Sequence, residues 1–208
     1  MPIIAIDGQS ATGKSTAARA VAAQLQGFCI DTGEMLRDAT LKALELGLDP
    51  AQASSIIKYL KVDPQERRSP AQLYIIEVER AVPIFAGTLV AQNALTSLLR
   101  NHVNSTSLYI ISGRTIGLDV FPDAMLKINL RAELETRAAR KASQLGIGKA
   151  QALNLISGRD HLDRTRQTNP LRRDHRAIEI DTTARPPAHI ALAIIDSYKR
   201  TVEENNHN

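Results

Sequence analysis

A glycine-rich segment near the start of the chain has the spacing of a phosphate-binding loop. Residues 8–16 fit the pattern G-x-x-x-x-G-K-[ST]. In such a loop, backbone N–H groups and the N-terminus of the following helix bind phosphate oxygens, because both carry partial positive charge. We expect Lys14 to neutralise the β- and γ-phosphates and to be catalytic, and the Ser15 hydroxyl to bind Mg²⁺. The predicted nucleotide-binding residues are Gly8, Ser10, Ala11, Thr12, Gly13, Lys14, Ser15 and Thr16.

The surroundings of this loop support that prediction. An apolar run at 3–6 precedes it and an amphipathic stretch at 14–25 follows it, which is the strand–loop–helix context that the motif requires. The chain contains no N-K-x-D motif, with which GTPases read guanine. ATP is therefore favoured as the nucleotide.

Short β-branched runs alternate with longer helical stretches along the chain. Strands are predicted at 3–6, 27–30, 108–111, 126–130 and 177–180, and helices at 14–25, 34–46, 88–102, 132–145, 149–166 and 187–203. This alternation predicts an α/β fold in which helices cover a five-stranded parallel sheet. We expect one domain over 1–208, with its core at 1–46 and 87–208 and a small helical insert at about 47–86. Within the insert, Asp49-Pro50 and Ser69-Pro70 each predict a helix start, and the tail at 203–208 is expected to fray.

Composition restricts the partners of the chain. The net charge is +4, and residues 131–176 carry eleven basic and five acidic side chains. Such a segment suits nucleic acid, acidic membranes or phosphorylated ligands. However, seven aromatic residues and no tryptophan argue against a base-stacking surface, and the apolar run at 2–6 is too short to span a membrane. A single cysteine fits a reducing compartment. We expect a cytoplasmic monomer that acts on small-molecule nucleotides, with no nucleic acid and no membrane as partner.

Further short blocks follow the loop in a recognisable order. They are Ile6-Asp7-Gly8, Ile30-Asp31-Thr32-Gly33 with Arg37, Gly113-Arg114, Val120-Phe121-Pro122-Asp123-Ala124 with Lys127-Ile128, Gly158-Arg159-Asp160 with Asp163 and Arg166, and Ile180-Asp181-Thr182-Thr183. In these blocks, which span about three-quarters of the chain, the sequence resembles the bacterial cytidylate kinases. The resemblance implies a P-loop kinase with an acceptor-binding insert and a basic lid at about 145–166, which transfers a phosphoryl group from ATP to CMP or dCMP.

The resemblance also implies roles for individual residues. Thr32 and Arg37 fall where the acceptor nucleotide is held, and Arg37 and Arg114 where its phosphate is gripped. Arg159 and Asp163 fall near its ribose, and Arg166 near the transferred phosphoryl group. The predicted acceptor-binding residues are thus Asp31, Thr32, Arg37, Arg114, Arg159 and Asp163, and the predicted catalytic residues are Lys14, Arg114 and Arg166. Arginine suits these roles, because its fork matches phosphate oxygens. At i, i+4 and i+7, Arg159, Asp163 and Arg166 share a helix face.

Several positions depart from the family pattern. Ser112 and Thr115 flank Gly113-Arg114 where the family has two aspartates, and Leu162 stands where an arginine is common. A gapless count back from Arg114, uncertain by about one residue, puts Asn93 at the base-reading arginine. The first lost carboxylate supports Mg²⁺ in P-loop enzymes, so we expect Asp7 or Asp31 to replace it. Because lost polar readers reduce discrimination, the pattern predicts altered or relaxed base specificity.

Three further functions stay open on the sequence alone. The altered base-reading positions also suit a P-loop kinase with another acceptor, such as UMP or a metabolite. The missing carboxylates at Ser112 and Thr115 suit a catalytically weak ATP-binding regulatory protein. A nucleic-acid-binding role explains only the basic segment and is the weakest. For a kinase we expect the lid and the insert to close over the substrates, with Gly146 and Gly148 as hinges.

Overall fold

The computed structural model describes residues 1–66 and 68–206, which form two compact units. We call them the sheet unit, comprising Met1–Asp31, Val103–Glu133 and the described residues from Arg172 onward, and the helical unit, comprising Thr32–His102 and Leu134–Leu171. The chain passes from one unit to the other four times, so each unit assembles segments that lie far apart in the sequence.

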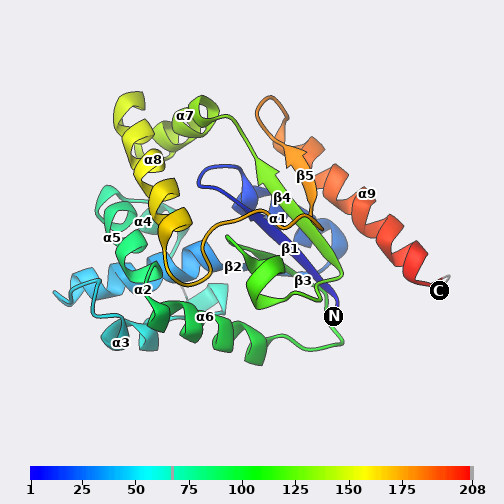
Figure 1. Ribbon diagram of the computed structural model, residues 1–208, viewed down its shortest axis with the longest axis horizontal. Helices are drawn as coiled ribbons and strands as arrows, with labels where there is room; N and C mark the ends of the chain where they lie inside the picture. Colours follow the sequence, from blue (N-terminus) through cyan, green and yellow to red (C-terminus); the bar gives the residue numbers. More distant parts are fainter. Residues whose placement is uncertain (67, 207–208) are drawn as a thin grey trace. The chain divides into compact units, whose positions relative to one another are not determined.

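The sheet unit is built on five parallel strands. They are β1 (Ile3–Gly8), β2 (Phe28–Asp31), β3 (Tyr109–Ser112), β4 (Leu126–Arg131) and β5 (Ile178–Asp181). The strand order is β2-β3-β1-β4-β5, so β1 occupies the centre, between β3 and β4 (Figure 1). This confirms the predicted α/β fold with a five-stranded parallel sheet.

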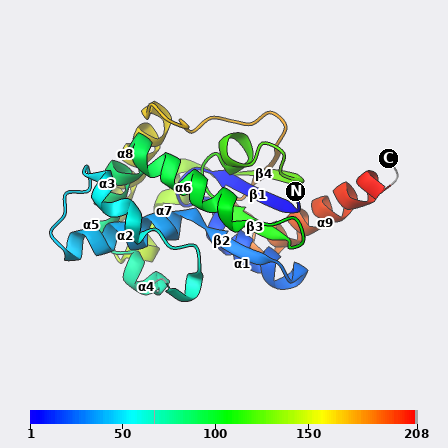
Figure 2. The same ribbon diagram turned by 90° about the horizontal axis from the view of Figure 1, so that it is seen from below.

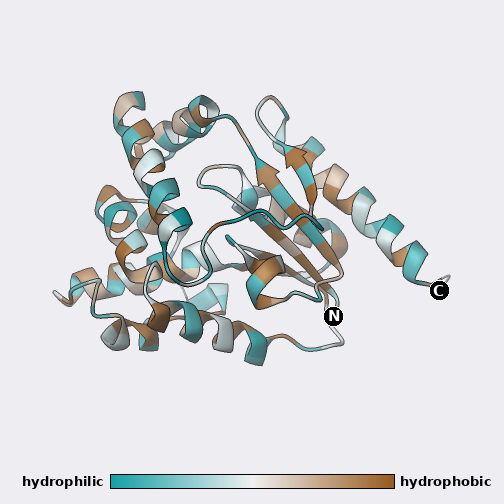
Figure 3. Cartoon of the chain, in the orientation of Figure 1, coloured by the Kyte–Doolittle hydropathy of each residue, from teal (hydrophilic) through white to brown (hydrophobic). Residues whose placement is uncertain are grey.

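Two helices cover one face of this sheet. Helix α1 (Lys14–Leu25) and helix α9 (Pro187–Asn206) lie side by side below the strands in Figure 2. Small side chains such as Ala18 on α1 and Ala191 on α9 pack with Ile4, Ile6 and Ile128 of the sheet in one buried cluster. Figure 3 shows the contrast between the mostly hydrophobic strands and the mixed surface of these helices. Burial of this apolar face holds the sheet unit together.

A short π-helix, η3 (Ile116–Val120), lies on the opposite face. A Cβ atom added at Gly117 would be 3.2 Å from the Cβ of Ala5 and 3.1 Å from the Cγ of Lys127, so η3 packs closely over β1 and β4. The sequence pattern did not predict this element, because one turn of helix is too short to show a period.

The helical unit contains the remaining helices. They are α2 (Thr32–Glu45), α3 (Ala53–Ile56), η1 (Ile57–Tyr59), η2 (Pro64–Glu66), α4 (Pro70–Leu73), α5 (Ile76–Ala86), α6 (Leu89–His102), α7 (Leu134–Leu145) and α8 (Lys149–Thr165). The predicted insert at 47–86 is helical, and Ser69 caps α4 as expected, since Ser69 and Gln72 form a capping box with Pro70 at the first turn.

Some predicted boundaries are wrong. Asp49-Pro50 does not begin a helix: the Asp49 carboxylate accepts a hydrogen bond from the N–H of Ala51 in a turn, and α3 begins at Ala53. Helix α9 continues to Asn206 instead of fraying from 203, and α8 ends at Thr165, one residue early. Strands β2, β3 and β5 each end on a polar residue, one position later than the apolar pattern predicts.

No single helix in the described residues is both long and apolar enough to cross a membrane. Helices α5 and α6 would meet that test only as a pair, and they are bent by 90° at the break between them.

Candidate functional site

The phosphate-binding loop connects β1 to α1, and its two glycines are required by geometry. Gly8 has φ +147°, and a Cβ there would lie 2.2 Å from the carbonyl oxygen of Leu130, so no other residue fits. Gly13 has φ +93° and precedes the first turn of α1. Both backbone conformations are open to glycine and costly for other residues. The sequence prediction of this loop between a strand and a helix is therefore confirmed in its structural context.

Inside the loop, side chains bond to the backbone. The Lys14 ammonium donates to the carbonyl oxygen of Gln9 at 2.6 Å, and the Thr12 hydroxyl donates to the same oxygen at 3.0 Å. These contacts tie the side chains of Lys14 and Thr12 to the backbone of the loop. Ala11 has φ +59°, a left-handed conformation that a non-glycine residue adopts at a cost. The loop is thus stabilised by its side chains in a shape its backbone does not prefer.

Thr182 fixes the loop from outside, and the sequence analysis gave it no role. Its hydroxyl donates to the carbonyl oxygen of Thr12 at 2.9 Å, although 170 residues separate the two in sequence. Thr182 is fully buried, and its N–H donates to the carbonyl oxygen of Arg131 at the end of β4. In the sequence, the sign of a role for Thr182 was its place in the block 180–183, through which the chain resembles the family. The strand order is what brings this residue to the loop.

Arg114 and Asp7 organise the neighbouring edge of the sheet unit. The Arg114 guanidinium donates to the carbonyl oxygen of Gly8 at 3.2 Å, so this predicted catalytic residue lies against the phosphate-binding loop. Asp7 accepts hydrogen bonds from the N–H groups of Ile116 and Gly117, both at 2.8 Å, and so anchors η3. Burial raises the pKa of Asp7 to about 6, although these two bonds and the charges of Lys14 and Arg114 lower it.

The two positions at which the family has aspartates, Ser112 and Thr115, lie at the end of β3 and just before η3. Ser112 ends β3 and Thr115 precedes η3, and both are buried. Asp31 ends β2 beside Ser112 in the strand register and is also buried. Since the Asp7 carboxylate already accepts hydrogen bonds from two backbone N–H groups, Asp31 is the better of the two candidates to replace the missing acid.

The segment before β5 carries charged residues that pair with other parts of the sheet unit. The Lys127 ammonium of β4 lies 3.3 Å from the Asp174 carboxylate, and both side chains are buried. Arg172 pairs with Asp119 of η3. Burial would raise the pKa of Asp174, but hydrogen bonds from Arg176 and Lys127 outweigh it and hold that pKa below its usual value. Of these two pairs, only Arg172–Asp119 pairs a cation of the basic segment 131–176 with an acid outside it.

In the helical unit, Arg37 binds a carboxylate of the same unit. Its Nε and Nη2 atoms lie 2.9 and 2.7 Å from Oε1 of Glu79, and Nη1 donates to the carbonyl oxygen of Gly33 at 2.9 Å. The Lys141 ammonium lies 3.0 Å from the same Glu79 oxygen. Burial would raise the pKa of Glu79, but the charges of Arg37 and Lys141 outweigh it and lower that pKa to about 2. The sequence analysis did not single out Glu79 or Lys141.

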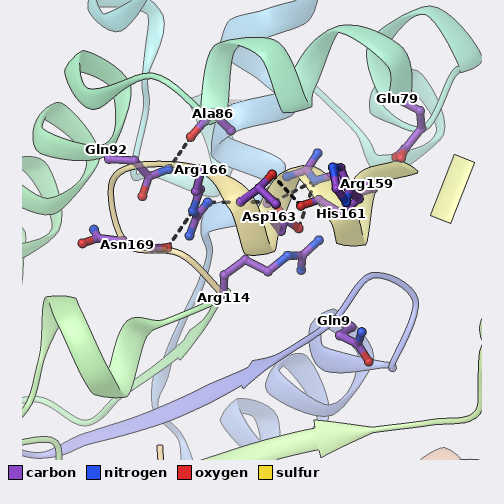
Figure 4. A network of polar contacts seen from close by, with 12 residues as sticks. Gln9, Glu79, Ala86, Gln92, Arg114, Arg159, His161, Asp163, Arg166 and Asn169 are labelled. Carbon is purple, nitrogen blue, oxygen red and sulfur yellow. Dashed lines mark hydrogen bonds and ion pairs between the residues drawn. The ribbon is translucent and has the colours of Figure 1, made fainter. Parts of the chain in front are cut away.

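Helix α8 brings together the three predicted lid residues (Figure 4). The Nε atom of Arg159 lies 3.1 Å from each oxygen of Asp163, one turn along the helix. Arg166 follows the last helical residue, where its Nε donates to the carbonyl oxygen of Asn169 at 2.6 Å and its Nη1 lies 3.9 Å from Asp163. The three side chains form one cluster, although Arg166 reaches it from beyond the helix end.

The structure places two positions at which the sequence departs from the family pattern. Asn93 is exposed on α6, so it does not face the interior of the helical unit. Its neighbour Gln92 is buried, and its amide donates to the carbonyl oxygen of Ala86 at 2.6 Å (Figure 4). The amide of Gln92 is thus buried and that of Asn93 is exposed, and the assignment of a base-reading position on α6 stays a prediction. Leu162 is exposed on α8.

The central strand order, the loop after β1 and the arginines on following elements define a P-loop kinase. Among solved structures, a gluconokinase from Sinorhizobium meliloti has a similar fold, with a TM-score of 0.51 and 15% identity over 99% of this chain and 96% of that one. Residues 4–200 match the sequence profile of the family described as cytidylate kinase. The chain belongs to the cytidylate kinase family.

Curated relatives agree with this assignment. A cytidylate kinase from Mycobacterium leprae is 33% identical over 213 residues, which cover 95% of this chain and 96% of the relative. A cytidylate kinase from Listeria innocua is 35% identical over 219 residues, which cover 96% of this chain and 97% of the relative. The similarity extends over segments of both units, so it includes the loop and the segments predicted to be the insert and the lid.

Proposed function

We propose that this protein transfers the γ-phosphoryl group of ATP to CMP or dCMP, in the cytoplasm and as a monomer. The observation that carries the proposal is the match over residues 4–200 to the cytidylate kinase family, together with a phosphate-binding loop whose glycine geometry is intact. No nucleic acid or membrane is needed as a partner in this reaction.

Residues of the sheet unit supply the donor side of this proposal. The N–H groups of the loop and the start of α1 bind phosphate oxygens, and Lys14 leaves the Gln9 carbonyl to neutralise them. Arg114, which borders the loop, stabilises charge on the transferred group. The reaction depends on positioning and charge stabilisation, so no acid–base pair is required.

The residues present fit a magnesium ion. The Ser15 hydroxyl lies in the first turn of α1 and is partly exposed, and its oxygen is the hard ligand that Mg²⁺ prefers. Within 1–66 and 68–206, no group of three His, Cys, Asp or Glu side chains is placed to hold a metal. Ser15 would therefore hold the ion together with water and substrate phosphates. An ion held there would supply positive charge that neutralises phosphate oxygens of ATP.

Residues of the helical unit supply the acceptor side. We assign Thr32 and Arg37 to the acceptor nucleotide, Arg159 and Asp163 to its ribose, and Arg166 to the transferred phosphoryl group. The contact between Arg159 and Asp163 holds one arginine in a fixed orientation. The family resemblance supports these roles, and the clustering of the three α8 residues is consistent with them.

An ADP-release assay tests the proposal, with ATP, Mg²⁺ and a panel of CMP, dCMP, UMP, AMP and GMP. We expect turnover with CMP or dCMP and, because Thr115 and the counted position Asn93 stand where the family has charged base readers, weaker discrimination against UMP than an aspartate and an arginine would give. The variant Lys14→Ala is expected to lose at least about 100-fold in kcat, since it removes a charge at the transferred group. Turnover that is unchanged in Lys14→Ala, or absent with every monophosphate despite ATP binding, would refute the proposal.

A further inference from the structure

In the helical unit, a buried carboxylate is bound to the arginine that is predicted to hold the acceptor phosphate. Three donor contacts converge on Oε1 of Glu79: two from Arg37 at 2.9 and 2.7 Å and one from Lys141 at 3.0 Å. The side chains of Arg37, Glu79 and Lys141 are only 9%, 6% and 3% exposed. Two cations thus share one carboxylate oxygen. The same arrangement of cations suits a phosphate oxygen.

An aromatic ring completes the cluster. The guanidinium carbon of Arg37 lies 4.6 Å and the Lys141 ammonium 5.4 Å from the centroid of the Tyr74 ring. Both cations are therefore held against a negative ring face as well as against Glu79. The carboxylate and the ring together hold the two cations in place.

The fork of Arg37 is the part that matters for an acceptor. Nε and Nη2 form the edge that binds an oxyanion with two parallel hydrogen bonds, and both atoms are occupied by Glu79. A phosphate that takes this edge must displace the carboxylate. Lys141 lies close enough to keep Glu79 paired after the exchange, which avoids an unpaired buried charge.

We propose that Glu79 is a placeholder anion, which occupies the acceptor-phosphate position on Arg37 and so sets the affinity for the acceptor. This inference rests on the proposed function, in which Arg37 binds the phosphate of the nucleoside monophosphate. Glu79 acts through Arg37 and is a positioning residue. It remains charged throughout the physiological range, because the neighbouring cations lower its pKa to about 2, so the exchange depends on acceptor concentration and not on pH.

The test compares Glu79→Gln with Glu77→Gln, which removes the same charge from an exposed position two residues earlier on α5. We expect Glu79→Gln to lower the KM for CMP and the Kd of CMP measured by calorimetry roughly tenfold, because the competing state is lost. The KM for ATP should stay within about twofold, as the ATP phosphates bind in the loop after β1. Glu77→Gln should behave as the wild type.

A purely structural ion pair gives different results. Removing the charge of Glu79 takes a carboxylate away from two buried cations, so both models predict a lower Tm for the free protein. Only the placeholder model predicts that saturating CMP raises the Tm more in Glu79→Gln than in the wild type. The double variant Arg37→Ala with Glu79→Gln must lose the gain in affinity. An unchanged or raised Kd for CMP in folded Glu79→Gln overturns the inference.

Two further outcomes separate a failure of folding from a failure of the proposed function. If Glu79→Gln does not unfold cooperatively, Glu79→Asp replaces it: the shorter side chain keeps the charge but withdraws it from Arg37, and it should lower the Kd for CMP by a smaller factor or else contradict the proposal. If the wild type converts no monophosphate, the proposed function fails. The calorimetric Kd of CMP in the four proteins still decides the role of Glu79 in that case.

Discussion

At the residue scale, the phosphate-binding loop depends on one contact from the far end of the chain. The Thr182 hydroxyl donates to the carbonyl oxygen of Thr12 and is buried, so water cannot take its place. Loop residues such as Ala11 adopt an unfavourable conformation, which needs support from outside the loop. We infer that Thr182 maintains the loop in its nucleotide-binding shape.

Thr182→Val removes this hydroxyl and keeps the shape of the side chain. A buried hydrogen bond contributes about 1 kcal/mol, so we expect the KM for ATP to rise about fivefold while the KM for CMP changes little. Thr183→Val is the matched control, because its hydroxyl accepts a hydrogen bond from the N–H of Glu133 and does not contact the loop. Steady-state kinetics on both variants measure the effect, and equal ATP affinities in the two would contradict it.

At the scale of elements, the turn between α7 and α8 is set by two glycines with different backbones. Gly146 has φ +65°, whereas Gly148 has φ −66° and caps the start of α8. A Cβ atom meets no heavy atom within 4 Å at either position. The two glycines therefore differ only in backbone conformation. Since Gly146 has the left-handed conformation, it is the stronger candidate for a hinge before α8.

Gly146→Ala forces an L-residue into the left-handed region, at a cost of about 1 kcal/mol. We expect this substitution to lower the free energy of unfolding by that amount, and Gly148→Ala to leave it unchanged within about 0.5 kcal/mol. Urea denaturation of both variants gives the values. The account of this turn is wrong if Gly148→Ala is the more damaging change.

At the scale of the whole molecule, burial of one carboxyl group makes folding depend on pH. The folded pKa of Asp7 is about 6, above the ordinary aspartate value of 3.8, because burial disfavours its charged form. A raised carboxyl pKa contributes stability that is complete below the unfolded pKa and is lost as the pH rises through the folded pKa. The pKa values of Glu79, Asp174 and Asp181 are lowered, so these groups change the stability at more acidic pH.

The free energy of unfolding of the wild type, measured relative to Asp7→Asn, should therefore fall between about pH 4 and pH 6 and become constant above about pH 7. The difference between the two proteins removes the contributions of the other titrating groups. Denaturant titrations over this range provide the measurement. A difference that is flat from pH 4 to pH 7 would show that Asp7 keeps an ordinary pKa in the folded protein.

The sequence by itself determined the local features of this protein. The loop at 8–16, the five strands and most helix bounds follow from glycine spacing and from hydrophobic periods, which are properties of neighbouring residues. The blocks from Ile6-Asp7-Gly8 to Ile180-Asp181-Thr182-Thr183 were enough to indicate the family. Shorter elements such as η3 and the bounds at Asp49-Pro50 were missed, because a single turn has no period to detect.

Only the tertiary structure decided which distant residues meet. The strand order brings Thr182 to Thr12, and the folding of α5 and α7 beside α2 brings Glu79 and Lys141 to Arg37. The packing of α6 decides that Gln92 is buried while its neighbour Asn93 is exposed. No local pattern contains this information, because these contacts depend on the packing of segments that are separated by tens to more than a hundred residues.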